Sequence, residues 1–141
     1  ALCLAKGLQK EGVLHTIECR SSEADVAQRF FDKSLYKKQI CLHVGDAKDV
    51  LKNLHMEWDL VFVDADKTGY VGYYEFLVEK VKPGTWLLFD NVFFHGEVFE
   101  EPLTGKNAKA IDAFNKQIMD DPRVEKLMLT IRDGLTLLYK K

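Results

Sequence analysis

The sequence predicts an α/β protein built around a doubly wound, mostly parallel sheet that ends in an antiparallel hairpin. Three observations support this fold class. Helical and extended patterns alternate along the 141 residues, as they do where helices connect parallel strands. The stretch at 58–65, "WDLVFVDA", is almost continuously apolar, which is typical of a strand buried on both faces of a sheet. Near the C-terminus, two strand-like segments flank the turn formers Arg132, Asp133 and Gly134, which predicts a hairpin.

The first half of the chain predicts two strands separated by helices. Residues 13–19 carry β-branched side chains suited to a strand. The serines and the glutamate at 21–23 suit the start of a helix. In order, the expected elements are a helix end closed by Gly12, a strand at 13–19, a helix at 21–35, a strand at 39–44 and a helix at 45–54.

The second half of the chain continues the alternation of strands and helices. From Tyr70 to Val81, apolar and aromatic residues recur with helical spacing, so we expect the tyrosines of this helix to lie in the core. Segment 92–108 shows no period, and a loop of this length in a compact domain is commonly functional or mobile. The expected elements are a strand at 58–65, a helix at 70–81, a strand at 85–91, the loop at 92–108, a helix at 109–121 and strands at 124–131 and 135–141.

The amino-acid composition argues against several classes of protein. A net charge of −2 argues against nucleic-acid binding, which favours a basic surface. No apolar run is long enough for a membrane-spanning helix, and the first 12 residues do not form a signal peptide. Three cysteines without a CxxC pair predict reduced thiols in a cytoplasmic protein. We expect one domain over residues 1–141. Its start, "ALCLAKGL", resembles the middle of a helix, so we expect an N-terminally truncated chain.

Polar side chains collect where the predicted strands end. Glu18 lies at the end of the first strand, Asp46 follows the second, Asp64 lies at the end of the third, and Asp90 and Asn91 end the fourth. Ligands of open α/β sheets bind outside the carboxyl ends of the strands. A turn or helix cap explains any one of these acids, but four in succession at one edge predict a binding site.

The polar residues at the ends of the third and fourth strands predict a metal site. Carboxylate and amide oxygens, as on Asp64, Asp90 and Asn91, are hard ligands that suit Mg²⁺ or Ca²⁺. The ends of adjacent parallel strands lie roughly 5 Å apart, within reach of one ion. Lys67, three residues past Asp64, is a candidate general base, with a solvated surface lysine as the alternative.

Glu18 and the histidines carry weaker signals. A carboxylate at the end of such a strand can accept two hydrogen bonds from the cis-diol of a ribose. His15, His43 and His55 share no spacing and predict no site. His95 differs from them because it lies in the loop after Asp90 and Asn91.

The sequence resembles the cation-dependent O-methyltransferases that use S-adenosylmethionine, a group that includes the caffeoyl-CoA and catechol O-methyltransferases. The similar stretches span the chain: "LHTIE", "VGDAKDVL", "WDLVFVDADKTGYVGYYE", "VKPGTWLLFDNVFFHGEV", "AIDAFNKQIMDDPRVE" and "DGLTLLYKK". The most specific feature is "DLVFVDADK" followed by "DN" at 90–91.

The resemblance implies a Rossmann-like methyltransferase domain and a role for each candidate residue. Asp64, Asp90 and Asn91 match ligands of Mg²⁺ (or Ca²⁺ or Mn²⁺), Lys67 matches the catalytic base, Glu18 matches the acid on the cofactor ribose, and Asp46 and Ala47 match the loop beside the adenine. Asp64 also matches a residue near the methionine end of S-adenosylmethionine. The resemblance further implies a small phenolic substrate and a homodimer.

The chain departs from the family pattern at three places. Arg20 stands where members often carry an acid. His95 stands where the plant caffeoyl-CoA enzymes have a substrate-contacting asparagine, which marks His95 as a substrate contact and argues against the plant substrate. The first strand and glycine-rich loop of the family would precede Ala1, with that strand lying between the strands of Glu18 and Asp64.

The implied reaction moves a methyl group to one hydroxyl of a catechol-like acceptor, with Asp64 and Lys67 as the catalytic residues. A phospho-accepting receiver domain also uses acids and Mg²⁺, but it needs Ser or Thr where this chain has Asp90. A dinucleotide-dependent oxidoreductase would share Glu18 but has no need of the predicted metal ligands. A third alternative is a fragment without activity.

Overall fold

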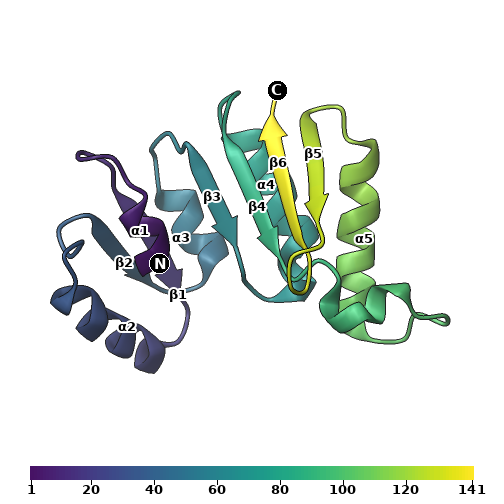
Figure 1. The fold of residues 1–141 in the computed structure, drawn as a ribbon, viewed down its shortest axis with the longest axis horizontal. Helices are drawn as coiled ribbons and strands as arrows, with labels where there is room; N and C mark the ends of the chain where they lie inside the picture. Colours follow the sequence, from purple (N-terminus) through teal and green to yellow (C-terminus); the bar gives the residue numbers. More distant parts are fainter. The chain divides into compact units, whose positions relative to one another are not determined.

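The computed structural model describes all residues from Ala1 to Lys141. The chain forms two compact units, Ala1–His55 and Met56–Lys141 (Figure 1). None of the helices is long and apolar enough to cross a membrane.

The first unit contains a parallel pair of strands with three helices. Its elements are α1 (Leu2–Lys6), β1 (Leu14–Glu18), α2 (Ser21–Lys33), β2 (Ile40–Val44) and α3 (Ala47–Asn53). The register runs from Leu14 opposite Ile40 to Glu18 opposite Val44. The amide of Gly45 donates to the carbonyl of Glu18 at 3.0 Å, so the carboxyl ends of the two strands are fastened together.

The first helix ends earlier than its sequence predicts. α1 closes at Gly7 rather than at Gly12, because the amide of Gly7 returns to the carbonyl of Leu4 at 2.9 Å. Gly12 instead closes a separate turn, with its amide 2.9 Å from the carbonyl of Gln9. The Gln39 side chain donates to the carbonyls of Gln9 and Gly12, both at 2.9 Å. These bonds hold the turn against the start of β2.

The second unit contains a four-stranded mixed sheet in the order β3-β4-β6-β5. Its elements are β3 (Leu60–Val63), η1 (Lys67–Gly69), α4 (Tyr70–Lys80), β4 (Trp86–Asp90), η2 (Phe94–Phe99), α5 (Lys106–Asp120), β5 (Val124–Leu129) and β6 (Leu135–Lys140). β3 and β4 are parallel, whereas β6 runs antiparallel to both β4 and β5. The predicted α/β class, parallel strands and terminal hairpin are confirmed.

One face of this sheet packs against α4 and α5 around a cluster of aromatic rings. The rings of Tyr70 and Tyr74 meet those of Phe89 and Phe114 edge-on, with centroids 5.5–6.3 Å apart. Such edge-to-face pairs add about 0.5–1.5 kcal/mol each beyond area burial. The predicted apolar positions of α4 are all buried: Tyr70, Tyr73, Tyr74, Leu77, Val78 and Val81. The expectation that these tyrosines lie in the core is therefore confirmed.

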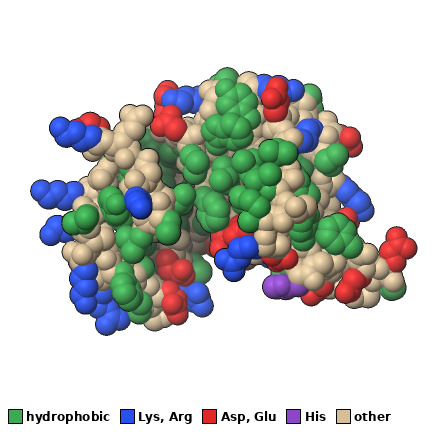
Figure 2. Space-filling view, in the orientation of Figure 1, with side chains coloured by type: hydrophobic (Ala, Val, Ile, Leu, Met, Phe, Trp, Pro, Cys, Tyr) green, Lys and Arg blue, Asp and Glu red, His purple; other side chains and the backbone are tan.

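The other face of the sheet is open, which corrects the prediction that the strand at 58–65 is buried on both faces. Leu60 and Phe62 are 47% and 40% exposed, whereas Val63 is buried. On β4, Trp86 is exposed and Leu87 is buried. Figure 2 shows hydrophobic side chains gathered over these strands. Among residues 1–141, β3 pairs with β4.

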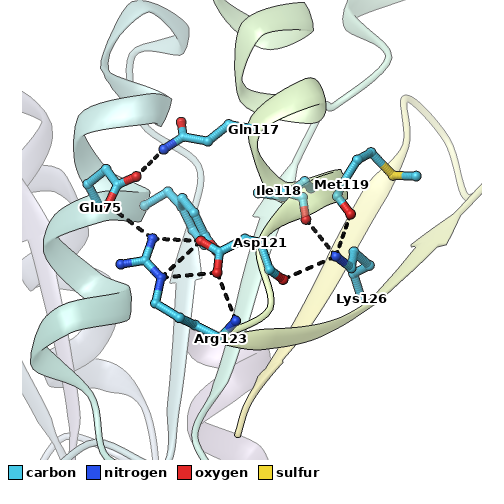
Figure 3. A network of polar contacts seen from close by, with 8 residues as sticks. Glu75, Gln117, Ile118, Met119, Asp121, Arg123 and Lys126 are labelled. Carbon is cyan, nitrogen blue, oxygen red and sulfur yellow. Dashed lines mark hydrogen bonds and ion pairs between the residues drawn. The ribbon is translucent and has the colours of Figure 1, made fainter.

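A polar network fastens α4, α5 and β5 (Figure 3). Arg123 donates to Asp121 and Glu75, and Gln117 donates to the same Glu75. The ammonium of Lys126 donates to three carbonyls at the C-terminus of α5 at 2.6–3.2 Å. The last carbonyls of a helix carry the negative end of its dipole, so a cation placed there stabilises the helix end.

Candidate active site

The carboxyl ends of β3 and β4 bring three of the predicted residues together. The parallel register places Val63 opposite Phe89, so Asp64 follows one strand where Asp90 ends its neighbour. Asn91 comes next, in a left-handed conformation (φ 59°) that asparagine tolerates better than most residues. Its backbone amide donates to the carboxylate of Asp90 at 2.8 Å. This bond holds the Asp90 carboxylate against the backbone of Asn91.

Lys67 is the centre of this cluster. Its Nζ lies 3.1 Å from Asp64 Oδ1, 3.1 Å from Asn91 Oδ1 and 3.4 Å from the carbonyl oxygen of Asp90. Its side chain is 12% exposed, compared with 53% for Asp64. The alternative of a solvated surface lysine is therefore wrong. Oxygens from two strand ends converge on one positive charge.

Tyr70 completes the cluster, and its hydroxyl was not assigned a role from the sequence. Lys67 donates to this hydroxyl at 2.6 Å, and the hydroxyl donates to the carbonyl of Asp90 at 2.7 Å. Burial, followed by the charge of Asp64, raises the pKa of Tyr70, so the phenol keeps its proton. The spacing of three residues from Lys67, one turn of helix, is the signal that could have indicated this contact.

The donor set fits a hard divalent cation. The structure holds no group of three or more His, Cys, Asp and Glu side chains that could bind a metal, so the amide oxygen of Asn91 is needed as the third ligand beside Asp64 and Asp90. All three are oxygen donors of the kind that Mg²⁺ and Ca²⁺ prefer, with water or a substrate oxygen completing the shell. Two of them already point at the Lys67 ammonium. The cluster therefore suits a cation.

Asp66, two residues past Asp64, has a different role. Its carboxylate accepts from the hydroxyls of Tyr73 and Thr68 at 2.8 and 3.3 Å. A Cβ at Gly69 would lie 2.7 Å from this carboxylate. Asp66 therefore organises the turn between β3 and α4.

The hairpin turn between β5 and β6 holds the segment that follows Asn91. The amides of Val92 and Phe93 donate to the carbonyls of Gly134 and Asp133 at 3.2 and 2.9 Å. The amide of His95 donates to the Asp133 carboxylate at 2.6 Å. The His95 side chain is 77% exposed and lies outside the hydrogen bonds of Lys67. Sequence reasoning missed Asp133 as a support of this segment, because the two positions lie 38 residues apart.

Three of the four predicted cofactor residues lie in the first unit, at the ends of β1 and β2, and the fourth, Asp64, belongs to the second unit. Glu18 accepts from the amide of Arg20 at 2.9 Å, and this bond lowers the pKa of its carboxyl. Asp46 caps α3 by accepting from the amide of Lys48 at 2.8 Å, and Ala47 is the first residue of that helix. The structure thus brings these three together, and each acid also has a local structural role.

Comparisons with known proteins show the family and the fold of the chain. Residues 1–141 match the family described as O-methyltransferase. The Dictyostelium discoideum protein named "Probable caffeoyl-CoA O-methyltransferase 1" is 34% identical over 146 residues, covering 99% of this chain and 64% of that protein. The catechol O-methyltransferase of Niastella koreensis is 31% identical over 147 residues, covering 98% of this chain and 66% of that protein. The O-methyltransferase of Bacillus cereus, solved in complex with SAH, has a TM-score of 0.89 at 29% identity, covering 98% of this chain and 67% of that one.

The α/β fold is that of the S-adenosylmethionine-dependent methyltransferases. Within that class, the chain belongs to the O-methyltransferase family. It spans about 64% of the length of the Dictyostelium relative. Membership of this family overturns two alternatives raised by the sequence, the receiver domain and the dinucleotide-dependent oxidoreductase.

Proposed function

We propose that the protein moves the methyl group of S-adenosylmethionine to one hydroxyl of an ortho-dihydroxy phenol in the presence of a divalent cation, Mg²⁺ or else Ca²⁺ or Mn²⁺. The observation that carries the proposal is the convergence of the Asp64 carboxylate, the Asn91 side-chain oxygen and the backbone carbonyl of Asp90 on the Lys67 ammonium. In a family of O-methyltransferases, oxygens arranged around a positive charge support a cation site. The chain covers only part of its relatives' length, so the proposal concerns the whole protein.

Each residue of the cluster would have a separate role in the reaction. Asp64, Asp90 and Asn91 would hold the cation, which when bound lowers the pKa of an acceptor hydroxyl. Lys67, in contact with Asp64 and Asn91, is placed to accept or steer the proton of that hydroxyl. His95 is exposed in the segment after Asn91 and would contact the acceptor. The protein's main contribution is to orient the oxygen in line with the methyl group.

The cofactor would lie against the ends of β1 and β2. Glu18 would accept the ribose hydroxyls, and Asp46 with Ala47 would line the adenine. A place for Asp64 near the methionine end stays a prediction from the family resemblance. The SAH bound in the Bacillus cereus relative supports this class of cofactor. A cytoplasmic location and a homodimer remain predictions, as do the single domain over 1–141 and the inactivity of residues 1–141 alone.

A pair of matched substitutions at the two ends of β3 tests the proposal. In the full-length protein, Asp64→Asn should abolish Mg²⁺ binding and lower kcat/KM for a catechol acceptor by about 100-fold or more, because it removes a charged ligand. Asp59→Asn makes the same change just before β3, where the side chain is 96% exposed, and should leave both unchanged. Calorimetric Mg²⁺ titration and methyl-transfer assays measure these effects. Full cation-dependent turnover by Asp64→Asn would contradict the metal assignment.

A further inference from the structure

The segment that follows Asn91 holds His95 in a strained backbone conformation. Phe94 and His95 have positive φ values of 46° and 57°, which residues with side chains adopt rarely and mostly near functional sites. Asp133 in the β5–β6 turn supports this conformation. Its carbonyl accepts from the amide of Phe93 at 2.9 Å, and its carboxylate accepts from the amide of His95 at 2.6 Å. The backbone of His95 is therefore fixed against the turn.

The carboxylate of Asp133 has a second oxygen that lacks a partner. Oδ1 is the oxygen that accepts from the amide of His95. Oδ2 is buried and has no hydrogen-bond partner, which costs free energy because the oxygen has given up its contact with water. Nδ1 of the His95 ring lies 3.8 Å from this Oδ2. Because the His95 side chain is 77% exposed, a small rotation of the ring brings Nδ1 within hydrogen-bond range.

This arrangement determines which ring nitrogen of His95 carries the hydrogen. A neutral imidazole has one N–H group and one nitrogen with a free lone pair, and the bond that one nitrogen makes fixes the role of the other. The carboxylate of Asp133 can only accept, so it favours hydrogen on Nδ1. Nε2 is then left with its lone pair and can accept a hydrogen bond from a ligand.

We propose that Asp133 is a positioning residue of the acceptor site. It holds His95 with Nδ1–H toward its own Oδ2, so that Nε2 accepts a hydrogen bond from an O–H or N–H group of the methyl acceptor. Carboxylates orient histidines in this way in other active sites. The inference rests on the proposed function, because it needs His95 to contact the acceptor. It adds the requirement that the acceptor carry a hydrogen-bond donor besides the two hydroxyls that the cation would hold.

Nitrogen-15 NMR of the full-length protein at pH 9, where imidazoles are neutral, shows which ring nitrogen of His95 carries the hydrogen. The spectrum of His95→Ala assigns the signals. We expect the hydrogen on Nδ1 in the parent and on Nε2 in Asp133→Asn. The asparagine keeps an oxygen for the His95 amide but turns an N–H group toward the ring, where it donates to Nδ1. Hydrogen on Nε2 in the parent would overturn the proposal, even if the Asp133 variant fails to fold.

Two acceptors that differ by one hydrogen-bond donor test the role of Nε2 in the full-length protein. They are 3,4-dihydroxybenzylamine, whose ammonium group only donates, and 4-methylcatechol, which lacks that group. We expect Asp133→Asn to lower the ratio of their kcat/KM values at least about tenfold, through KM rather than kcat. The charge control is Asp59→Asn, at an exposed position before β3, and it should leave the ratio unchanged.

A double substitution shows whether Asp133 acts through His95. In a His95→Ala background, Asp133→Asn should change the ratio less than about threefold, because the ring that it orients is gone. An equal fall in both backgrounds would show a general effect of the turn and reject the positioning role. A parent protein that methylates neither phenol would reject the proposed function instead, and the NMR spectrum would still decide whether Asp133 orients the ring.

Discussion

At the scale of single residues, the Tyr70 hydroxyl connects the candidate base to the strand that carries Asp90, a proposed metal ligand. Replacing Tyr70 with Phe leaves Lys67 and the Asp90 carbonyl without this partner. We expect kcat of the full-length protein to fall about 10- to 100-fold because Lys67 is no longer held in place. We also expect a loss of about 1–3 kcal/mol in the free energy of unfolding. Steady-state kinetics and urea unfolding measure the two effects.

The control is Tyr73→Phe, one turn along on the same helix. It removes the hydroxyl that donates to Asp66 at 2.8 Å, so it should cost stability but leave kcat nearly unchanged. If both variants lose kcat in proportion to their lost stability, Tyr70 has no specific role in placing Lys67.

Asp121 makes the stability of the second unit dependent on acid. Its buried carboxylate accepts from Arg123 at 2.6 Å and from Tyr74 at 2.7 Å. These groups, Arg123 first, hold its pKa well below the usual range. A carboxyl with a depressed folded-state pKa adds stability above its unfolded pKa of about 4, and loses it as the pH falls through the folded value. We therefore expect the free energy of unfolding to fall steadily below about pH 4–5.

Asp121→Asn tests this assignment. We expect it to lower the free energy of unfolding by about 1–3 kcal/mol at pH 7. We also expect it to reduce the dependence of that free energy on acid. Urea unfolding from pH 3 to pH 7 measures both. The matched control is Asp112→Asn, since Asp112 pairs with Lys116 on the surface of α5 and should change little. An Asp121→Asn variant with the full acid dependence of the parent would contradict the assignment.

At the scale of elements, the β5–β6 turn supports the segment after the proposed metal ligand Asn91 through Gly134. Its φ is 82°, and a Cβ there would lie 2.7 Å from the ring of Phe93. We expect Gly134→Ala to lower the free energy of unfolding by about 1–3 kcal/mol. We also expect it to weaken Mg²⁺ binding, because Phe93 is hydrogen-bonded to this turn and follows Asn91 by two residues.

The control is Gly72→Ala, on α4, where a Cβ would meet nothing within 4 Å. It should leave the free energy of unfolding unchanged or raise it by about 1 kcal/mol. Unfolding and Mg²⁺ titration compare the two, and unchanged Mg²⁺ affinity in a folded Gly134→Ala would separate the turn from the site.

Local patterns predicted most elements and part of the site. The helical spacing of apolar residues located α4 and its buried face, and the end of "DLVFVDADK" located Asp64 and Lys67. Contacts made across the fold could not be predicted this way. Whether Gly7 or Gly12 ends α1, and which residue supports His95, depend on partners that the local sequence does not specify. The apolar run of β3 gave no indication that one of its faces is open.

At the scale of the whole molecule, buried apolar side chains are divided unequally between the two units. In Ala1–His55 they are Ala5, Ala24 and Phe31 alone. In Met56–Lys141 they include the aromatic cluster and the apolar faces of α4 and α5. Apolar burial is the main stabilising term in folding, so the first unit should open at a lower free-energy cost. The predicted cofactor residues Glu18 and Asp46 therefore belong to the less stable part of the chain.

Hydrogen exchange of the 141-residue chain measures this difference. We expect the amides of β1 and β2 to exchange at least about 100-fold faster than those of β4 and β6, since local opening follows the density of buried contacts. S-adenosylmethionine, if it binds through Glu18 and Asp46, should slow exchange in β1 and β2 and leave β4 and β6 nearly unchanged, because a ligand stabilises the part of the structure that it contacts. Equal protection of all four strands without ligand would show that the chain unfolds as one cooperative unit, despite the unequal distribution of its core.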